Sequence, residues 1–350
     1  MITNQALTCQ LSKAVQLNCD IADSQHAGDY TMCVYLLKMR EYFRWEKGYH
    51  YTDKLPSETL GAWLSERESL WDTLSNDEFA AIDVLGLEID PFDNEAANQV
   101  LNPEGLVYSG GIGRQCRPHF FLAELVEIRR HKQYTLYLAG KEQARDLTSP
   151  PAMSLGNTIF IRRESLKRMI WEKVEEWNWR KTNTAMTHAL SYYDFDTDTH
   201  AALEAITDQE QDTVLRHEIG EIEAGMLLDE CWHSMLAAMT LPKGEIMIRA
   251  IRDHLADCIS TLPNMLAKQR DASLHFYFGQ FNAMRRELFP GLLDAYKQWH
   301  DNGILDPLEN KVLQGRQHWL DVGRHITDIF QTSGPQSSPD IVAYIEKNIL

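Results

Sequence analysis

Apolar residues recur at helical spacing through the first hundred residues of the chain. The segment 30–47 contains neither proline nor glycine and is rich in leucine, methionine, arginine and glutamate, which favour helices. It stops at Gly48, and glycine often ends helices because it adopts the left-handed conformation at little cost. A further helix is predicted over 57–74, where Ser57 can cap the first turn. The N-terminal region is therefore predicted to be helical.

The pattern changes between about residues 105 and 163, where short β-like runs alternate with glycines. The segments 106–108, 134–138 and 158–161 are short and rich in β-branched or aromatic residues. The longer apolar run 119–128 is compatible with either a strand or a helix. This region is predicted to be a small β-containing insertion in a helical protein.

Helical periodicity returns from residue 164, and Pro242, Pro263 and Pro290 mark the expected helix boundaries. The predicted fold class is α+β, predominantly α-helical, with a helical-bundle core. The predicted regions are N-terminal helices at 1–104, the insertion at 105–163, a C-terminal bundle at 164–331 that packs with the N-terminal helices, and a linker with a terminal helix at 332–350.

Composition narrows the functional classes. The 350 residues include 51 acidic and 34 basic side chains, and the formal net charge of −17 argues against a broad nucleic-acid-binding surface. No apolar run approaches the roughly 18 residues of a membrane-spanning helix. The N-terminal segment does not resemble a secretory signal, and the cysteines, without CxxC spacing, are typical of reduced thiols. We therefore expect a cytoplasmic protein that binds neither nucleic acid nor membrane.

Two short motifs place an acid three residues before a histidine, so that both side chains share one face of a helix. They are Asp23 with His26 and Glu230 with His233. A carboxylate oxygen and an imidazole nitrogen at this spacing can converge on a metal ion, and di-iron helical bundles use Glu-x-x-His twice. For Asp23 and His26, the alternatives are an aspartate that orients a buried histidine and a solvated helix face. For Glu230 and His233, the alternative is an ordinary acidic first turn of a helix.

The densest cluster of charged residues lies at 216–223. His217 and Glu218 begin an HExxE sequence, which differs from the HExxH motif of zinc proteases. On a helical projection, Glu218 and Glu221 lie beside the apolar stripe, on a flank that includes Gly225. The missing side chain of Gly225 is expected to let another helix approach closely. Half-buried carboxylates need a partner, which is either a metal ion or an arginine.

A further pair of carboxylates lies on the predicted helix 245–262. Asp253 and Asp257 are one turn apart and lie opposite its main apolar face, so this helix is expected to be central to a bundle. Inward-facing aspartates there need a metal ion or a positively charged partner. Arg249 and Arg252 can equally pair with acids on neighbouring helices.

The two acid–histidine pairs and the two carboxylate pairs together form the ligand inventory of a carboxylate-bridged di-iron or di-manganese bundle. The candidate metal ligands are Asp23, His26, His217, Glu218, Glu221, Glu230, His233, Asp253 and Asp257. Fe or Mn is the expected cofactor if a metal is bound, and otherwise no cofactor is expected. The order of these pairs along the chain differs from the ferritin-like order.

Arginine and aromatic residues are enriched in three stretches, at 38–46, 171–180 and 273–286. Such residues are enriched at the centres of protein interfaces, but they also fill hydrophobic cores. Two interpretations stay open: buried faces of amphipathic helices, or an aromatic–arginine surface that contacts a protein partner.

Three segments, DIADSQHAGDYTMCVYLLKMREYFRWEKG, RHEIGEIEAG and IRDHLADCISTLPNML, resemble those of an uncharacterised bacterial protein family. The resemblance implies a helix-rich cytoplasmic protein, and it transfers no catalytic residue because no activity is attached to the family. Whether the protein is an enzyme stays open. One hypothesis is a metal-dependent helical-bundle oxidoreductase that uses carboxylate and histidine ligands. The other is a non-catalytic binding or regulatory protein whose acid–arginine pairs are structural.

Overall fold

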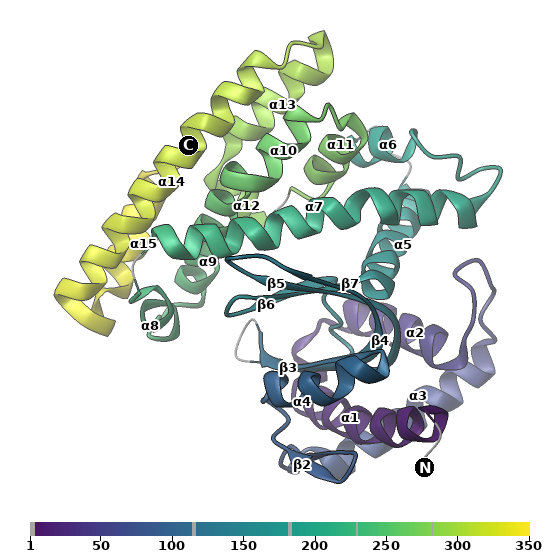
Figure 1. The fold of residues 1–350 in the computed structure, drawn as a ribbon. Helices are drawn as coiled ribbons and strands as arrows, with labels where there is room; N and C mark the ends of the chain where they lie inside the picture. Colours follow the sequence, from purple (N-terminus) through teal and green to yellow (C-terminus); the bar gives the residue numbers. More distant parts are fainter. Residues whose placement is uncertain (1–3, 114–116, 181–183, 229, 282) are drawn as a thin grey trace. The chain divides into compact units, whose positions relative to one another are not determined.

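A computed structural model describes residues 4–113, 117–180, 184–228, 230–281 and 283–350 of the chain (Figure 1). The protein has an α+β fold that is mostly helical, as its sequence predicts. Contacts within the chain divide it into two compact units, Met1–Trp171 and Glu172–Leu350, and the division falls inside helix α5 (Arg163–Arg180). None of the helices that the structure describes is both long and apolar enough to cross a membrane.

Unit 1 combines helices with two antiparallel or mixed sheets. Its helices are α1 (Asn4–His26), α2 (Met32–Lys47), α3 (Ser57–Leu74) and α4 (Asn94–Leu101). Strands β1 (Ile82–Val84) and β2 (Leu87–Ile89) form a hairpin inside the region 1–104, for which the sequence pattern predicts only helices. A curled five-stranded sheet contains, in spatial order, β3 (Leu106–Ile112), β4 (Pro118–Arg130), β5 (Thr135–Arg145), β7 (Thr158–Arg162) and β6 (Ala152–Leu155). Strands β5 and β7 pair in parallel, and the other neighbours pair antiparallel.

Helix α1 packs against one face of the five-stranded sheet. Leu11, Val15 and Ala22 are buried at helical spacing along α1, and they share a hydrophobic cluster with Phe120 and Leu122 of β4. Helix α4 packs against β3 and contributes to the same cluster. The apolar stripe of α1 is therefore buried by strands that lie about a hundred residues further along the chain.

The apolar run 119–128 belongs to strand β4. Phe120 and Leu122 lie in the cluster with α1, whereas Phe121 and Ala123 lie in a second cluster with Phe160 of β7. A strand buried on both faces lacks the alternation of apolar and polar residues that distinguishes a half-buried strand. This is why the sequence pattern alone is equally compatible with a helix.

Unit 2 contains helices and no strands in its described part. Its α-helices are α6 (Ala185–Leu190), α7 (Thr199–Leu227), α8 (Trp232–Ala237), α9 (Pro242–Ala256), α10 (Leu262–Ala267), α11 (Asp271–Gly279), α12 (Ala283–Leu288), α13 (Pro290–Asn302), α14 (Asp306–Ser333) and α15 (Ser338–Lys347). Helix α9 is central, because α7, α12, α14 and α15 all pack against it. Its Ile248, Ile251 and Leu255 are fully buried, as their helical spacing predicts.

The C-terminal segment contains less linker than its composition suggests. Helix α14 extends to Ser333, a short 3-10 turn at Gly334–Ser337 follows, and α15 begins at Ser338. Ile341 and Ile345 of α15 are buried in the main core of unit 2. The terminal helix is therefore an integral part of this unit.

Most aromatic residues of the arginine–aromatic stretches fill hydrophobic cores. Tyr42 and Phe43 are buried in a cluster of unit 1, and Tyr277 and Phe278 are buried in the main core of unit 2. Trp179 differs, since it is 73% exposed. The core interpretation therefore accounts for most of these side chains, and the protein partner stays a prediction.

Candidate metal centre

Helices α7 and α9 approach closely at Gly220. A Cβ atom on Gly220 would lie only 2.4 Å from the carbonyl oxygen of Ala256, the last residue of α9. Because glycine has no Cβ atom, the two backbones can come closer here than with any other residue. The expectation that Gly225 provides this close approach is wrong, since no described atom lies within 4 Å of a Cβ atom at that position.

His217 lies one turn before Gly220 on α7 and faces two carboxylates. Its Nδ1 is 2.8 Å from Oδ1 of Asp257, and its Nε2 is 3.5 Å from Oε1 of Glu221. Burial by itself lowers the pKa of His217, but the charges of Asp257 and Glu221 outweigh burial and raise the pKa well above its ordinary value. In the absence of a metal ion, these carboxylates therefore hold His217 as an imidazolium at neutral pH.

Asp257 orients this histidine. It is buried and begins a π-helical segment, η4 (Asp257–Thr261), which continues α9 with a wider turn. Its carboxylate also accepts hydrogen bonds from the Tyr277 hydroxyl at 2.9 Å and from the Arg285 guanidinium. Burial raises its pKa, but Arg285 and His217 outweigh burial, so the pKa of Asp257 lies well below its usual range. Asp257 is therefore an ionised carboxylate with three hydrogen-bond donors.

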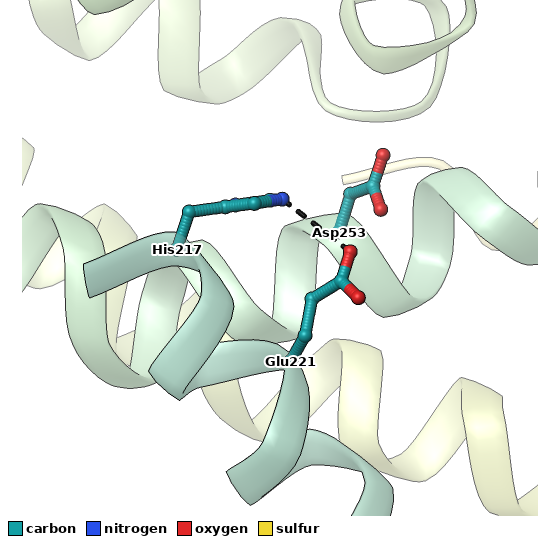
Figure 2. A group of neighbouring side chains, drawn as sticks. All are labelled: His217, Glu221 and Asp253. Carbon is teal, nitrogen blue, oxygen red and sulfur yellow. Dashed lines mark ion pairs between the residues drawn. The ribbon is translucent and has the colours of Figure 1, made fainter. Parts of the chain in front are cut away.

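Asp253 completes a group of side chains with metal-binding spacing. His217, Glu221 and Asp253 each offer one ligand atom, and these atoms all lie within 4.8 Å of one another. Figure 2 shows the imidazole nitrogen facing the Glu221 carboxylate, with Asp253 of the neighbouring helix beside them. Ligand distances of about 2.1 Å require ligand atoms about 3 Å apart. Small side-chain movements can bring the three ligand atoms from separations of up to 4.8 Å to about 3 Å.

The contact with Asp257 is typical of a metal-binding histidine. A ligating histidine commonly donates its other ring N–H to a carboxylate, which fixes its tautomer and its orientation. With Nδ1–H of His217 donating to Asp257, Nε2 is the ring nitrogen that faces Glu221, and it offers a lone pair once the imidazolium has lost its second proton. Metal binding must then displace a proton from this ring, so metal affinity is expected to rise with pH.

An arginine on α9 also binds one of these carboxylates. Nη2 of Arg252 lies 3.2 Å from Oε2 of Glu221, which confirms that Arg252 pairs with an acid on a neighbouring helix. Arg249 instead pairs with Glu245 on its own helix, at 2.9 Å. The Arg252 contact leaves Oε1 of Glu221 on the side of His217.

The cluster balances its own charge. Its three carboxylates belong to Glu221, Asp253 and Asp257, and its three cationic groups belong to His217, Arg252 and Arg285. A charge-balanced cluster is also what a structural network between packed helices requires. The geometry is therefore compatible with both hypotheses that the sequence leaves open.

Three other predicted ligands of unit 2 lie outside the group with metal-binding spacing. Glu218 is buried on α7, whereas Glu230 and His233 are exposed just before and within α8. Asp229, the residue before Glu230, lies outside the described residues. Although His233 is exposed, partial desolvation of its ring and the nearby charges of Arg252 and Arg249 lower its pKa. His233 is therefore a neutral imidazole at pH 7.

The remaining two predicted ligands belong to unit 1. Both carboxylate oxygens of the buried Asp23 accept a hydrogen bond from the backbone N–H of Leu147, at 3.0 and 2.9 Å. Burial raises the pKa of Asp23 well above its usual value, and the neighbouring Asp146 adds to this effect. Nδ1 of His26 lies 3.5 Å from a carboxylate oxygen of Asp29. These contacts are typical of structural side chains.

Two partners of Asp257, Tyr277 and Arg285, were not predicted from the sequence. They follow Asp257 by 20 and 28 residues, so helical spacing relates neither of them to it. Both belong to the arginine–aromatic stretch 273–286, and this enrichment was the available signal. It indicated a contact without indicating which carboxylate these residues bind.

The fold and the cluster together define a helix-rich α+β protein with a candidate metal centre in its C-terminal unit. Residues 10–162 match the N-terminal domain, and residues 167–348 the C-terminal domain, of a family of unknown function, DUF6866. The chain belongs to this family. No curated protein and no solved structure matches it. The boundary between the two family domains lies close to the division between the two units.

Proposed function

We propose that the protein is a metal-dependent oxidoreductase that binds one iron or manganese ion through His217, Glu221 and Asp253. The observation that supports this proposal is the orientation of His217, whose Nδ1 contacts Asp257 while its Nε2 lies on the side of Glu221. One imidazole and two carboxylates suit Fe2+ and Mn2+. Three ligands on one side of an ion leave positions for dioxygen or a small substrate.

The proposal uses one ion, whereas the ligand inventory of the sequence suggests two. Within the described residues, a single group of three side chains has metal-binding spacing. A dinuclear carboxylate centre needs ligands from four helices. Helices α7 and α9 supply all three members of this group.

A non-catalytic binding or regulatory protein is the second candidate, and the ion pairs favour it. Arg252 pairs with Glu221, and Arg285 pairs with Asp257. On this alternative, the cluster joins α7 to α9 and to the segment that follows α11, and it needs no metal ion. Removing one partner of such a network leaves an uncompensated buried charge, which destabilises a fold strongly.

Metal titration of the 350-residue chain tests the proposal. The protein is purified without affinity-tag metals, stripped with a chelator and titrated anaerobically with Mn2+ and Fe2+. We expect one ion per chain and a loss of about tenfold or more in affinity for Asp253→Asn. Glu245→Gln is the matched control, because it removes another acid of α9 whose partner is Arg249. On exposure to dioxygen, iron bound to the wild-type chain should oxidise faster than iron mixed with Asp253→Asn.

Two outcomes refute the metal centre. One is that neither ion binds the stripped protein, and the other is that Asp253→Asn binds metal as tightly as Glu245→Gln. The second candidate then predicts that Arg252→Gln lowers the free energy of unfolding, because Glu221 loses its guanidinium partner. If an ion binds but bound iron is inert to dioxygen, the metal site stands and direct activation of dioxygen by bound iron is refuted.

A further inference from the structure

Three histidines from three helices of unit 2 lie together. His188 belongs to α6, His275 to α11 and His300 to α13. The ring centroids are 4.2 Å apart for His188 and His300, 5.4 Å for His188 and His275, and 5.5 Å for His275 and His300. This histidine cluster shares no residue with the candidate metal centre.

The packing of α6 against α11 holds two of these histidines together. A Cβ atom on Gly279 of α11 would lie 3.0 Å from Cε and 3.1 Å from the backbone nitrogen of Met186. Glycine at this position lets the two helices approach closely, two residues before His188 on α6 and four residues after His275 on α11. The backbone therefore places the two imidazoles side by side.

Tyr296 orients the buried member of the cluster. Its hydroxyl lies 2.8 Å from Nδ1 of His275, and its ring is stacked on His300, one turn further along α13, with an interplanar angle of 10°. When Nδ1–H of His275 donates to the hydroxyl oxygen, Nε2 keeps its lone pair. A hydrogen bond to the other ring nitrogen is the usual way in which proteins hold a metal-binding histidine.

Two of the three imidazoles, those of His188 and His275, are neutral at physiological pH because their pKa values are lowered. Burial lowers the pKa of His275 to about 4, and the neighbouring His188 and His300 add to the effect. Burial and His300 also lower the pKa of His188. A neutral imidazole is the form that binds metal ions, so a cation need not displace a proton from these two rings at pH 7.

We propose that His188, His275 and His300 bind one zinc-class divalent cation. A Zn–N distance of about 2.1 Å places each ring centroid about 3.2 Å from the ion, and tetrahedral angles then separate the centroids by about 5 Å. The observed separations of 4.2 to 5.5 Å bracket this value. Three nitrogen ligands favour Zn2+, Ni2+ or Cu2+ over Mn2+, and they leave a fourth position for water or a substrate atom.

Binding requires the rings to rotate. Among the described residues, only His217, Glu221 and Asp253 have ligand atoms that all lie within 4.8 Å of one another. His300 is exposed, and exposed side chains change rotamer within nanoseconds. The fixed, buried His275 and the exposed His300 therefore provide one oriented ligand and one that closes on the ion.

Zinc competition on the chelator-stripped 350-residue chain tests this site. Zn2+ is titrated against a chromophoric chelator, and Co2+ is added separately as a spectroscopic probe. We expect His300→Ala to weaken Zn2+ binding about tenfold or more and to remove the intense visible absorption of four-coordinate Co2+. His200→Ala is the matched control, since it removes another exposed histidine of unit 2. Circular dichroism verifies that both variants fold.

The variant Asp253→Asn separates this site from the proposed centre at His217. Zinc binding that survives Asp253→Asn and is lost in His300→Ala supports the histidine cluster, whatever the fate of Mn2+ and Fe2+ binding. Zinc binding that is equal in His300→Ala and His200→Ala overturns the proposal. Zinc binding that is lost only in Asp253→Asn also overturns it, because the ion then lies between α7 and α9.

Discussion

The close approach of α7 to α9 at Gly220 leads to the sharpest prediction. In Gly220→Ala, the new methyl group would start 2.4 Å from the carbonyl oxygen and 2.9 Å from the carbonyl carbon of Ala256. Both atoms are backbone, so no flexible side chain can yield. Ordinary van der Waals contact begins at about 3.4 Å, and the helices must therefore separate locally by about 1 Å.

Two opposing terms set the size of the effect on stability. Forcing a methyl group into a well-packed helix contact costs about 1–3 kcal/mol. Replacing a helical glycine by alanine returns about 1 kcal/mol through helix propensity. Gly225→Ala isolates the second term, because it lies on the same helix and its Cβ atom would contact no described atom within 4 Å. The difference between the two variants is therefore expected to be about 1–3 kcal/mol, with Gly220→Ala the less stable.

Urea unfolding and Mn2+ titration of the two variants measure the consequence. Separation of the helices also moves Asp257, the residue after Ala256, away from His217. We therefore expect Gly220→Ala to bind Mn2+ at least about tenfold more weakly than Gly225→Ala, because a site displaced by about 1 Å no longer holds its ligands in place. Equal stability of the two variants would refute the close contact. A stability difference without any change in Mn2+ affinity would show that the contact does not position the site.

Three further predictions concern buried charges. Glu210 is buried, and burial is the main cause that raises its pKa from 4.5 to about 7. The folded protein therefore holds this proton more tightly than the unfolded chain does. The contribution of Glu210 to the free energy of unfolding falls by about 3 kcal/mol as pH rises from about 4.5 to 7. Glu210→Gln should remove that slope in urea unfolding, and parallel pH profiles of variant and wild type would contradict the assignment. Arg162→Met should cost about 3–5 kcal/mol in thermal unfolding, because Nε of Arg162 lies 2.8 Å from Oε1 of the buried Glu142; Arg162→Met/Glu142→Leu should recover much of the loss, and an equally unstable double variant would argue against the pair. Mn2+ affinity should rise about tenfold per pH unit up to the raised pKa of His217, because the ion displaces its proton; a pH-independent affinity would exclude His217 as a ligand.

Local structure followed from local sequence in much of the chain. Gly48 ends α2 in the left-handed conformation, with φ at 70°, as expected of a C-cap glycine. Pro242 and Pro290 are the first residues of α9 and α13, where a missing N–H is tolerated. These predictions succeeded because a helix end depends on the few residues that surround it.

Long-range contacts were predicted much less well. The sequence pointed to Gly225 as the position of close helix approach, whereas the contact is made by Gly220. A helical projection shows which residues share a flank, but it does not show which part of that flank meets another helix. That choice depends on where α9 crosses α7, and the crossing is set by the packing of the whole unit.

The sequence by itself determined the helical periodicity and the helix ends, because each depends on neighbouring residues of one element. It also determined which acids and histidines are available, because this is a matter of composition alone. It also marked His217, Glu221 and Asp253 as candidate ligands. Only the tertiary structure decided that these three lie together and that Tyr277 and Arg285 bind Asp257. The histidine cluster of α6, α11 and α13 is likewise a product of tertiary packing. Its members are far apart in the chain, and no periodicity within one helix specifies which faces of three helices meet.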